Sequence, residues 1–170
     1  MLKNKLFKLI SAAVAITCLG ATPVAMAATT ANTTLAVSAT VLATCIAVAT
    51  PVVFGNYTLT SLDNTGVITV TCTPDVTAYT VALDAGAGSG ATTSVRKMTF
   101  GANTLNYALY SDMGRNQNWG NVQNTDTVAA SAATTTVGVV KTFTVYGRLP
   151  ANQTSTAGVY SDTVQVSVTY

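Results

Sequence analysis

Short runs in which apolar and polar residues alternate recur along this chain, and they constrain its fold more than any other feature. A period of two residues places each apolar row on one face of a β-strand. Threonine and valine are abundant and glutamate is absent, which favours strands over helices. The chain is therefore predicted to be all-β, with antiparallel sheets packed as a sandwich. The rows are Ile68-Val70-Cys72, Tyr79-Val81-Leu83, Leu105-Tyr107-Leu109, Phe143-Val145 and Val164-Val166-Val168-Tyr170.

Clusters of turn-forming residues separate these rows. They lie at residues 63–66, 84–90, 116–121 and 149–158, where Gly, Asn, Asp and Pro predict turns or loops. Residues 125–136 are a low-complexity Thr/Ala/Ser tract. This tract is predicted to be a surface loop or a weak edge strand.

The start of the chain, up to Ala27, has the pattern of a secretory signal peptide. Lys3, Lys5 and Lys8 precede an apolar run from Leu9 to Leu19, and Ala25-Met26-Ala27 offers small residues for cleavage. A membrane anchor is the alternative, but about a dozen apolar residues is short for a span of roughly 20. Residues 1–27 are therefore predicted to be removed on export.

Cys18 lies in the signal segment, and Cys45 and Cys72 remain after its removal. An even pair of cysteines in an exported chain predicts a disulfide bond. Both side chains also continue apolar rows, so both are expected to point into the same core. A redox or metal-binding pair is the alternative, but neither a CxxC spacing nor any histidine is present.

The remaining polar residues give little sign of catalysis. Residues 28–170 carry five Lys or Arg and six Asp, a net charge of about −1, with no basic stripe for a nucleic acid. Without histidine, Ser-His and Cys-His nucleophilic catalysis is excluded. The spacing of the aspartates proposes no glycosidase pair. The chain is expected not to be an enzyme and to use no cofactor or metal.

Two positions allow a binding role beside a structural one. Trp119, among the amides of Gln117-Asn118-Trp119-Gly120, could stack on a sugar, although packing on the sandwich edge is favoured. Arg96-Lys97 could contact an anionic partner, although a solvated strand end is favoured.

A further alternating row, Leu35-Val37-Ala39-Val41, directly follows the predicted signal segment and ends near Cys45. It has the period of a half-buried strand. Two interpretations remain from the pattern alone. The row is the first strand of a complete sandwich, or another molecule covers it.

The chain resembles the spore coat U domain family, which includes the subunits of archaic (Csu-type) chaperone–usher pili. The motifs that carry the resemblance cover almost all of residues 28–170. The C-terminal motif is the most specific, and residues 121–136 match nothing in the family pattern. The motifs are Phe54-Gly55-Asn56-Tyr57, Val70-Thr71-Cys72, Leu105-Asn106-Tyr107-Ala108-Leu109-Tyr110 with Trp119-Gly120, Tyr146-Gly147-Arg148-Leu149-Pro150, Gln153, Gly158-Val159-Tyr160-Ser161-Asp162 and the strand from Val164 to Tyr170.

This resemblance implies an immunoglobulin-like β-sandwich that lacks its last strand and is completed by donor strand exchange. Residues 28–44 would be the donor extension, with Leu35, Val37, Ala39 and Val41 filling a neighbour's groove, and residues 45–170 the sandwich domain. The row Val164, Val166, Val168 and Tyr170 would face the core or the groove. The implied partners are other copies of the chain in a head-to-tail polymer, other pilus subunits, a periplasmic chaperone and an outer-membrane usher. The implied location is the cell surface.

The function that follows is a structural pilus subunit for adhesion and biofilm formation. A secreted adhesin or lectin-like protein and a spore or cell-coat protein are the alternatives. A tip adhesin of the implied family would carry a binding domain before the pilin part, and the short segment from Ala28 to Thr44 leaves no room for one.

Overall fold

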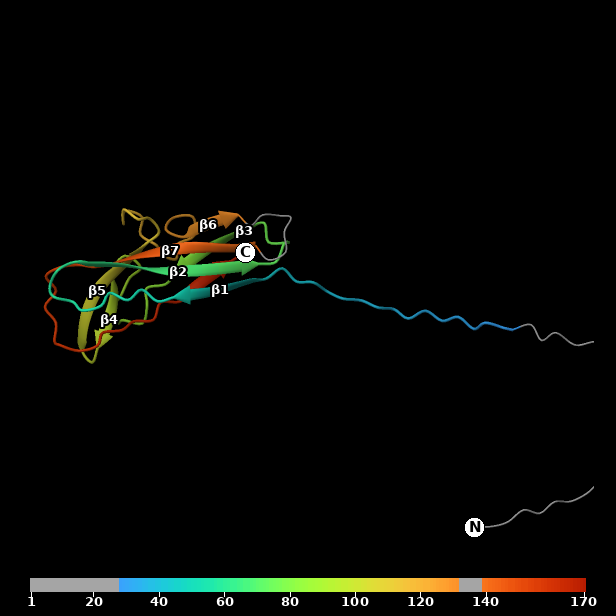
Figure 1. Cartoon of the computed structure of the whole chain (residues 1–170), viewed down its shortest axis with the longest axis horizontal. Helices are drawn as coiled ribbons and strands as arrows, with labels where there is room; N and C mark the ends of the chain where they lie inside the picture. The colour runs from blue at the N-terminus through green and yellow to red at the C-terminus, as the bar shows by residue number, and fades with distance from the viewer. Residues whose placement is uncertain (1–27, 132–138) are drawn as a thin grey trace, which may run out of the picture. The chain divides into compact units, whose positions relative to one another are not determined.

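The computed structural model describes residues 28–131 and 139–170, so the predicted signal peptide and residues 132–138 lie outside the described residues. The chain divides into two units between Ala39 and Thr40, and the fold below is that of Thr40–Tyr170 (Figure 1). The described residues form β-strands and no α-helix. Accordingly, none of their segments is a helix long and apolar enough to cross a membrane.

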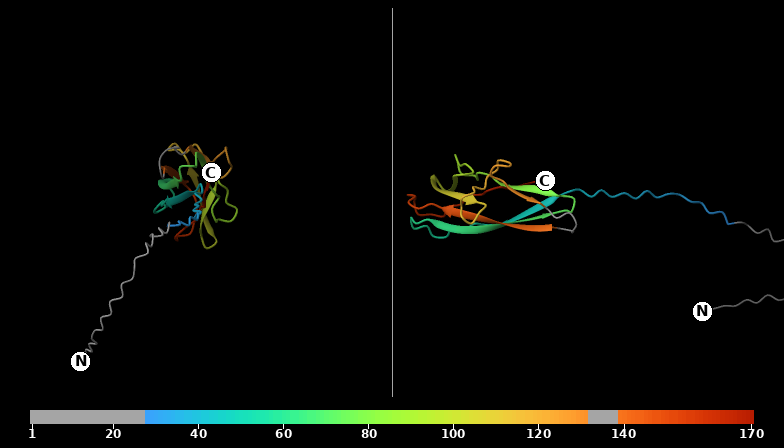
Figure 2. Two further views of the ribbon diagram at one scale, coloured as in Figure 1. Left: turned by 90° about the vertical axis from the view of Figure 1, so that its right-hand side faces the viewer. Right: turned by 90° about the horizontal axis from the view of Figure 1, so that it is seen from above.

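Two antiparallel sheets make up the domain, and their layers can be followed in Figure 2. The five-stranded sheet has the order β1-β2-β7-β5-β4, and the three-stranded sheet has the order β6-β3-β8. This confirms the predicted fold class, an all-β immunoglobulin-like sandwich. The strands are β1 (Cys45–Thr50), β2 (Leu62–Cys72), β3 (Ala78–Leu83), β4 (Arg96–Phe100), β5 (Asn103–Tyr110), β6 (Val128–Ser131), β7 (Val139–Leu149) and β8 (Val166–Thr169).

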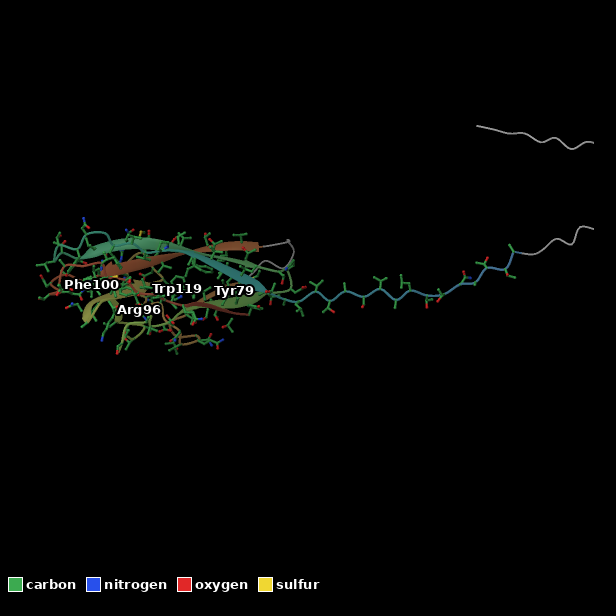
Figure 3. All side chains as sticks on the ribbon, turned by 90° about the horizontal axis from the view of Figure 1, so that it is seen from below. Tyr79, Arg96, Phe100 and Trp119 are labelled. Carbon is green, nitrogen blue, oxygen red and sulfur yellow. A yellow bond between two sulfur atoms is a disulfide. The ribbon has the colours of Figure 1, made fainter. Side chains whose placement is uncertain are left out.

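The alternating rows found in the sequence supply the core between the sheets. In β2, burial alternates from Gly66 to Cys72, as a period-two pattern requires. The ring of Phe143 from β7 lies edge-on to Tyr79 at 6.3 Å and to Trp119 at 6.2 Å between ring centroids. Figure 3 shows Tyr79 and Trp119 at successive positions along the sandwich. The predicted rows in β2, β3, β5 and β7 are therefore confirmed as core rows.

The turn predicted at residues 63–66 is wrong, because these residues lie inside β2 and pair with β7. Gly66 is buried, and the backbone of Thr50 passes close to it. A Cβ at this position would lie 2.7 Å from the carbonyl oxygen of Thr50. Asp63 accepts two hydrogen bonds from Arg148, each 2.8 Å long, and these lower the pKa of its carboxyl. The glycine and the aspartate thus serve strand packing and pairing, not a turn.

The low-complexity tract contributes β6, which pairs with β3 at the edge of the smaller sheet. For its described residues the edge-strand prediction is confirmed.

Candidate functional site

The N-terminal extension, residues 28–44, forms no strand in the described chain. Its alternating row is exposed: Leu35 and Val37 are each 87% exposed, and Val41 is 79% exposed. Ala39 is exposed as well. An isolated apolar residue at a surface is ordinary, but a row of them in strand phase is available for pairing with an open sheet edge.

A groove of about 1030 Å³ opens along the side of the sandwich. The segment from Ala49 to Tyr57, which continues β1, forms one wall, and residues 158–166 form much of the other. The floor is apolar and consists of Ile68, Leu83, Met98, Leu105, Leu109, Val145 and Leu149, with the Tyr107 side chain beside them.

Edge strands flank this groove. β1 lies at one edge of the five-stranded sheet and β8 at one edge of the three-stranded sheet, and the two strands contact each other. Each therefore has one side that pairs with no other strand of the described chain. Unpaired strand edges expose backbone donors and acceptors that an added strand can satisfy.

The groove occupies the half of the sandwich away from the disulfide. Cys45 pairs with Cys72 at one end of β2, and Leu62 pairs with Leu149 at the other. Ala49 and later residues line the groove, whereas Cys45 and Ala47 do not. The groove thus extends along the side of the domain to the end opposite to the point where the extension leaves β1, and this end of the groove is called its mouth.

The predicted row of the last strand is only partly in place. Val164, Val166 and Val168 are half-buried and pack against the core, and the first two line the groove. Tyr170 does not join them, because it lies beyond the end of β8 and is 55% exposed. The pairing of β8 with β3 reaches only Thr169, so the terminal residue lacks a strand partner that would hold it against the core.

A disulfide bond joins Cys45 to Cys72, as predicted, and closes a loop of 27 residues. On the chain-entropy model such a bond contributes roughly 3 to 4 kcal/mol. Just before it, the backbone N–H of Thr44 donates to Oγ1 of Thr73 at 3.0 Å, and the N–H of Thr73 donates to the carbonyl of Thr44 at 2.9 Å. The start of the domain is therefore fixed to β2 up to Thr44.

Polar groups near the groove are engaged in structural hydrogen bonds. The Tyr107 hydroxyl donates to Oδ2 of Asp162 at 2.7 Å. Oδ1 of Asp162 accepts from the backbone N–H groups of Ala87 and Thr163, each at 2.8 Å. Burial and the bond to Asp162 raise the pKa of Tyr107, so it remains a hydrogen-bond donor at neutral pH. These bonds hold the wall that contains Asp162.

Arg96 is fully buried, with 0% of its surface exposed, so for this residue both the solvated strand end and the contact with an anionic partner are wrong. Its guanidinium donates to four carbonyls: Asp84 at 2.8 Å, Thr93 at 2.6 Å, Leu83 at 3.1 Å and Trp119 at 2.7 Å. Burial lowers the pKa of Arg96, and nearby carboxylates oppose that shift. Arg96 thus ties the end of β3 to the loops around it.

Trp119 is also buried, and its indole N–H donates to the carbonyl of Val81 at 2.9 Å. Its ring packs in the core, so the favoured packing role holds and the ring is not available to stack on a sugar. The sugar-stacking alternative is wrong for this reason. Within residues 28–131 and 139–170, His, Cys, Asp and Glu side chains form no group of three or more that could hold a metal ion.

Comparison with known proteins gives consistent results. The family model described as Spore Coat Protein U domain matches residues 31–167. Protein U of Myxococcus xanthus is 34% identical over 126 residues, which cover 71% of this chain and 67% of that protein.

Among solved structures, the domain is similar to a chain in the crystal structure of the CsuC-CsuE chaperone-tip adhesion subunit pre-assembly complex from archaic chaperone-usher Csu pili of Acinetobacter baumannii. The TM-score is 0.57 at 25% identity, over 77% of this chain. The match spans 40% of that chain. With a family model covering most of its length, the present chain belongs to the Spore Coat Protein U domain family.

Proposed function

We propose that this protein is a structural subunit of a chaperone–usher surface pilus and that it polymerises by donating residues 28–44 to the groove of a neighbouring copy. One observation carries the proposal: an apolar groove between two unpaired strand edges occurs in the same chain as an exposed, alternating apolar row. The sheet edges at the groove lack a pairing strand, and the exposed apolar row lacks a surface that would bury it. Because groove and extension belong to opposite ends of the domain, the contact repeats head to tail and yields a filament.

Inserting the row into the groove would satisfy both edges and bury its apolar side chains. Four side chains of about 100 Å² each, at roughly 25 cal/mol per Å², give on the order of 10 kcal/mol before association costs. Ala39 contributes less than Leu35, Val37 and Val41. Those costs remove much of the gain, so the durability of a fibre rests partly on slow unfolding of the joint.

A monomer with an open groove needs protection until it assembles, because exposed strand edges and apolar surface promote aggregation. A periplasmic chaperone would occupy the groove and an outer-membrane usher would exchange it for the next subunit. The likeness to a subunit solved in complex with its chaperone supports this route. In this proposal, residues 1–27 act as a signal peptide and residues 45–170 form the sandwich domain. The surface fibres serve adhesion and biofilm formation.

A coat function is the second candidate, and the description of the family favours it. The same strand donation would then build a layer around the cell. Negative-stain microscopy of cells with and without the chain distinguishes these outcomes, since loss of a pilus subunit removes fibres and loss of a coat subunit removes a surface layer.

The groove assignment is tested with a synthetic peptide of residues 28–41 and two matched variants in β8. Val166 lines the groove, whereas Val168 lies on the same row of the same strand outside it. Val166→Thr is expected to weaken peptide binding about tenfold, because a hydroxyl would be buried against an apolar strand. Val168→Thr is expected to leave the affinity unchanged, although both variants lower the stability of the domain to a similar extent.

Fluorescence polarisation with labelled peptide gives both affinities. The acceptor is the chain of residues 28–170 carrying Val37→Asp, so that its own extension does not compete. Absence of binding to this acceptor, or equal losses in the two threonine variants, would contradict the proposed groove.

A further inference from the structure

Leu59 is an unusual residue at the open end of the groove. Its φ is 63°, in the left-handed region that residues other than Gly, Asn and Asp rarely adopt. Its side chain lines the groove and is nevertheless 58% exposed. The strained backbone is thus not compensated by burial of this side chain in its own domain.

Hydrogen bonds hold Leu59 in this conformation. Its carbonyl accepts from the N–H of Asn152 at 2.9 Å. Next to it, the Tyr57 hydroxyl donates to the carbonyl of Pro150 at 2.9 Å and accepts from the N–H of Gln153 at 2.9 Å. The loops on both sides of the groove mouth are therefore joined, and the exposed leucine is held in place. Strain that the surroundings enforce is a reason to look for a function.

The length of the extension determines what comes near Leu59 when a second copy donates its strand. Only residues 42–44 separate Val41, the last residue of the apolar row, from Cys45, and so short a segment spans at most about 10 Å. Thr44 is already fixed to Thr73. A donor row seated in the groove must therefore bring the donor's domain close to the groove mouth.

Leu42 lies within that short connection. It is exposed, and in an extended chain it points away from the face that carries Val37 and Val41. It therefore does not enter the groove with the row, and it emerges where the strand leaves the groove mouth. The molecule's own Leu42 cannot take this place, because β2, with 11 residues or roughly 36 Å, separates the Cys45 end from the Leu59 end.

We propose that Leu59, at the mouth of the groove, forms a second contact between neighbouring copies by receiving Leu42 of the donating copy, a residue that follows the row seated in the groove. This inference rests on the proposed strand donation. It adds a side-chain contact at the groove mouth that fixes the position of one domain relative to the next. Two exposed apolar side chains are covered in the joint, and the strain at Leu59 is retained because it presents the side chain to the partner.

The test compares two synthetic peptides, residues 28–41 and residues 28–44, on the 28–170 acceptor carrying Val37→Asp. The longer peptide is expected to bind about tenfold more tightly, equivalent to about 1.4 kcal/mol. Leu59→Asn in the acceptor should remove this advantage, so that the two peptides bind the variant equally well. Leu42→Ser in the longer peptide should have the same effect, and combining both changes should cost no more than either one.

Thermal unfolding of the acceptor provides the control for a purely structural role. Asparagine tolerates the left-handed conformation, so Leu59→Asn is expected to keep or raise the unfolding midpoint. Val122→Asn removes another exposed apolar side chain, away from the groove lining, and should leave both affinities unchanged. Equal binding of the two peptides to the unchanged Leu59 acceptor, a tenfold advantage of the longer peptide that persists in Leu59→Asn, or a lower midpoint would each overturn the proposal. Failure of both peptides to bind would instead contradict strand donation itself.

Discussion

Val37→Asp is expected to stop assembly and leave a folded monomer. Val37 is exposed in the described chain, so the carboxylate costs the domain little before assembly. In the proposed joint the same side chain would enter an apolar groove, where an unpaired charge costs several kcal/mol or more. Size-exclusion chromatography and negative-stain microscopy should show monomer in place of fibres, with an unchanged unfolding midpoint.

Ser38→Asp is the matched control, because it adds the same charge to the opposite row of the extension. It is expected to retain most of the fibres. If both aspartate variants assemble equally well, or equally poorly, the row that enters the groove has been assigned to the wrong residues.

Arg96→Lys is expected to lower the free energy of unfolding by about 3 kcal/mol. The guanidinium satisfies four buried or partly buried carbonyls from three nitrogens, and a single ammonium group cannot reach all four. At least one buried carbonyl therefore loses its partner while a buried charge remains. Denaturant unfolding of the 28–170 chain in a non-assembling Val37→Asp background measures the loss.

Lys97→Arg makes the reverse change at the next position and serves as its control. The Lys97 ammonium makes one hydrogen bond, to the carbonyl of Ser89 at 3.2 Å, from a half-buried side chain. Its replacement should change stability by less than about 0.5 kcal/mol. Similar losses of unfolding free energy at both positions would mean that the four carbonyl contacts of Arg96 stabilise the domain no more than the single contact of Lys97.

The core could be predicted from the sequence because burial in a strand follows a local rule. Ile68, Val70 and Cys72 alternate with threonines, and that spacing alone places them on one face. The disulfide followed from the same rule, since Cys45 and Cys72 both continued apolar rows. The spacing of apolar residues shows which side chains share one face of a strand, and the apolar faces of these strands form the core.

Other features depend on contacts between distant segments, which a local pattern does not contain. Arg96 is buried because carbonyls from residues 83, 84, 93 and 119 converge on it. Gly66 resembled part of a turn, but its place is set by the close approach of Thr50. The groove, likewise, depends on how many strands each sheet has, and the spacing of apolar residues cannot give that number.

For the N-terminal extension, the sequence pattern predicted the apolar row but not what covers it. Its alternation identified Leu35, Val37, Ala39 and Val41 as a strand-like row. Whether that row belonged to its own sandwich could not be read from the pattern. In the described chain it pairs with no strand, and the adjacent domain presents two open edges beside an apolar groove. These observations motivate strand donation between copies.

The most direct test of strand donation is prolonged incubation of the 28–170 chain beside a variant lacking residues 28–41, followed by gel electrophoresis in SDS without heating. The full chain is expected to form a ladder of SDS-resistant oligomers. The truncated chain is expected to form none by itself and to shorten the ladder when mixed with the full chain, because it can accept a strand but cannot donate one. A full chain that stays monomeric, or a ladder that persists without residues 28–41, would contradict the account.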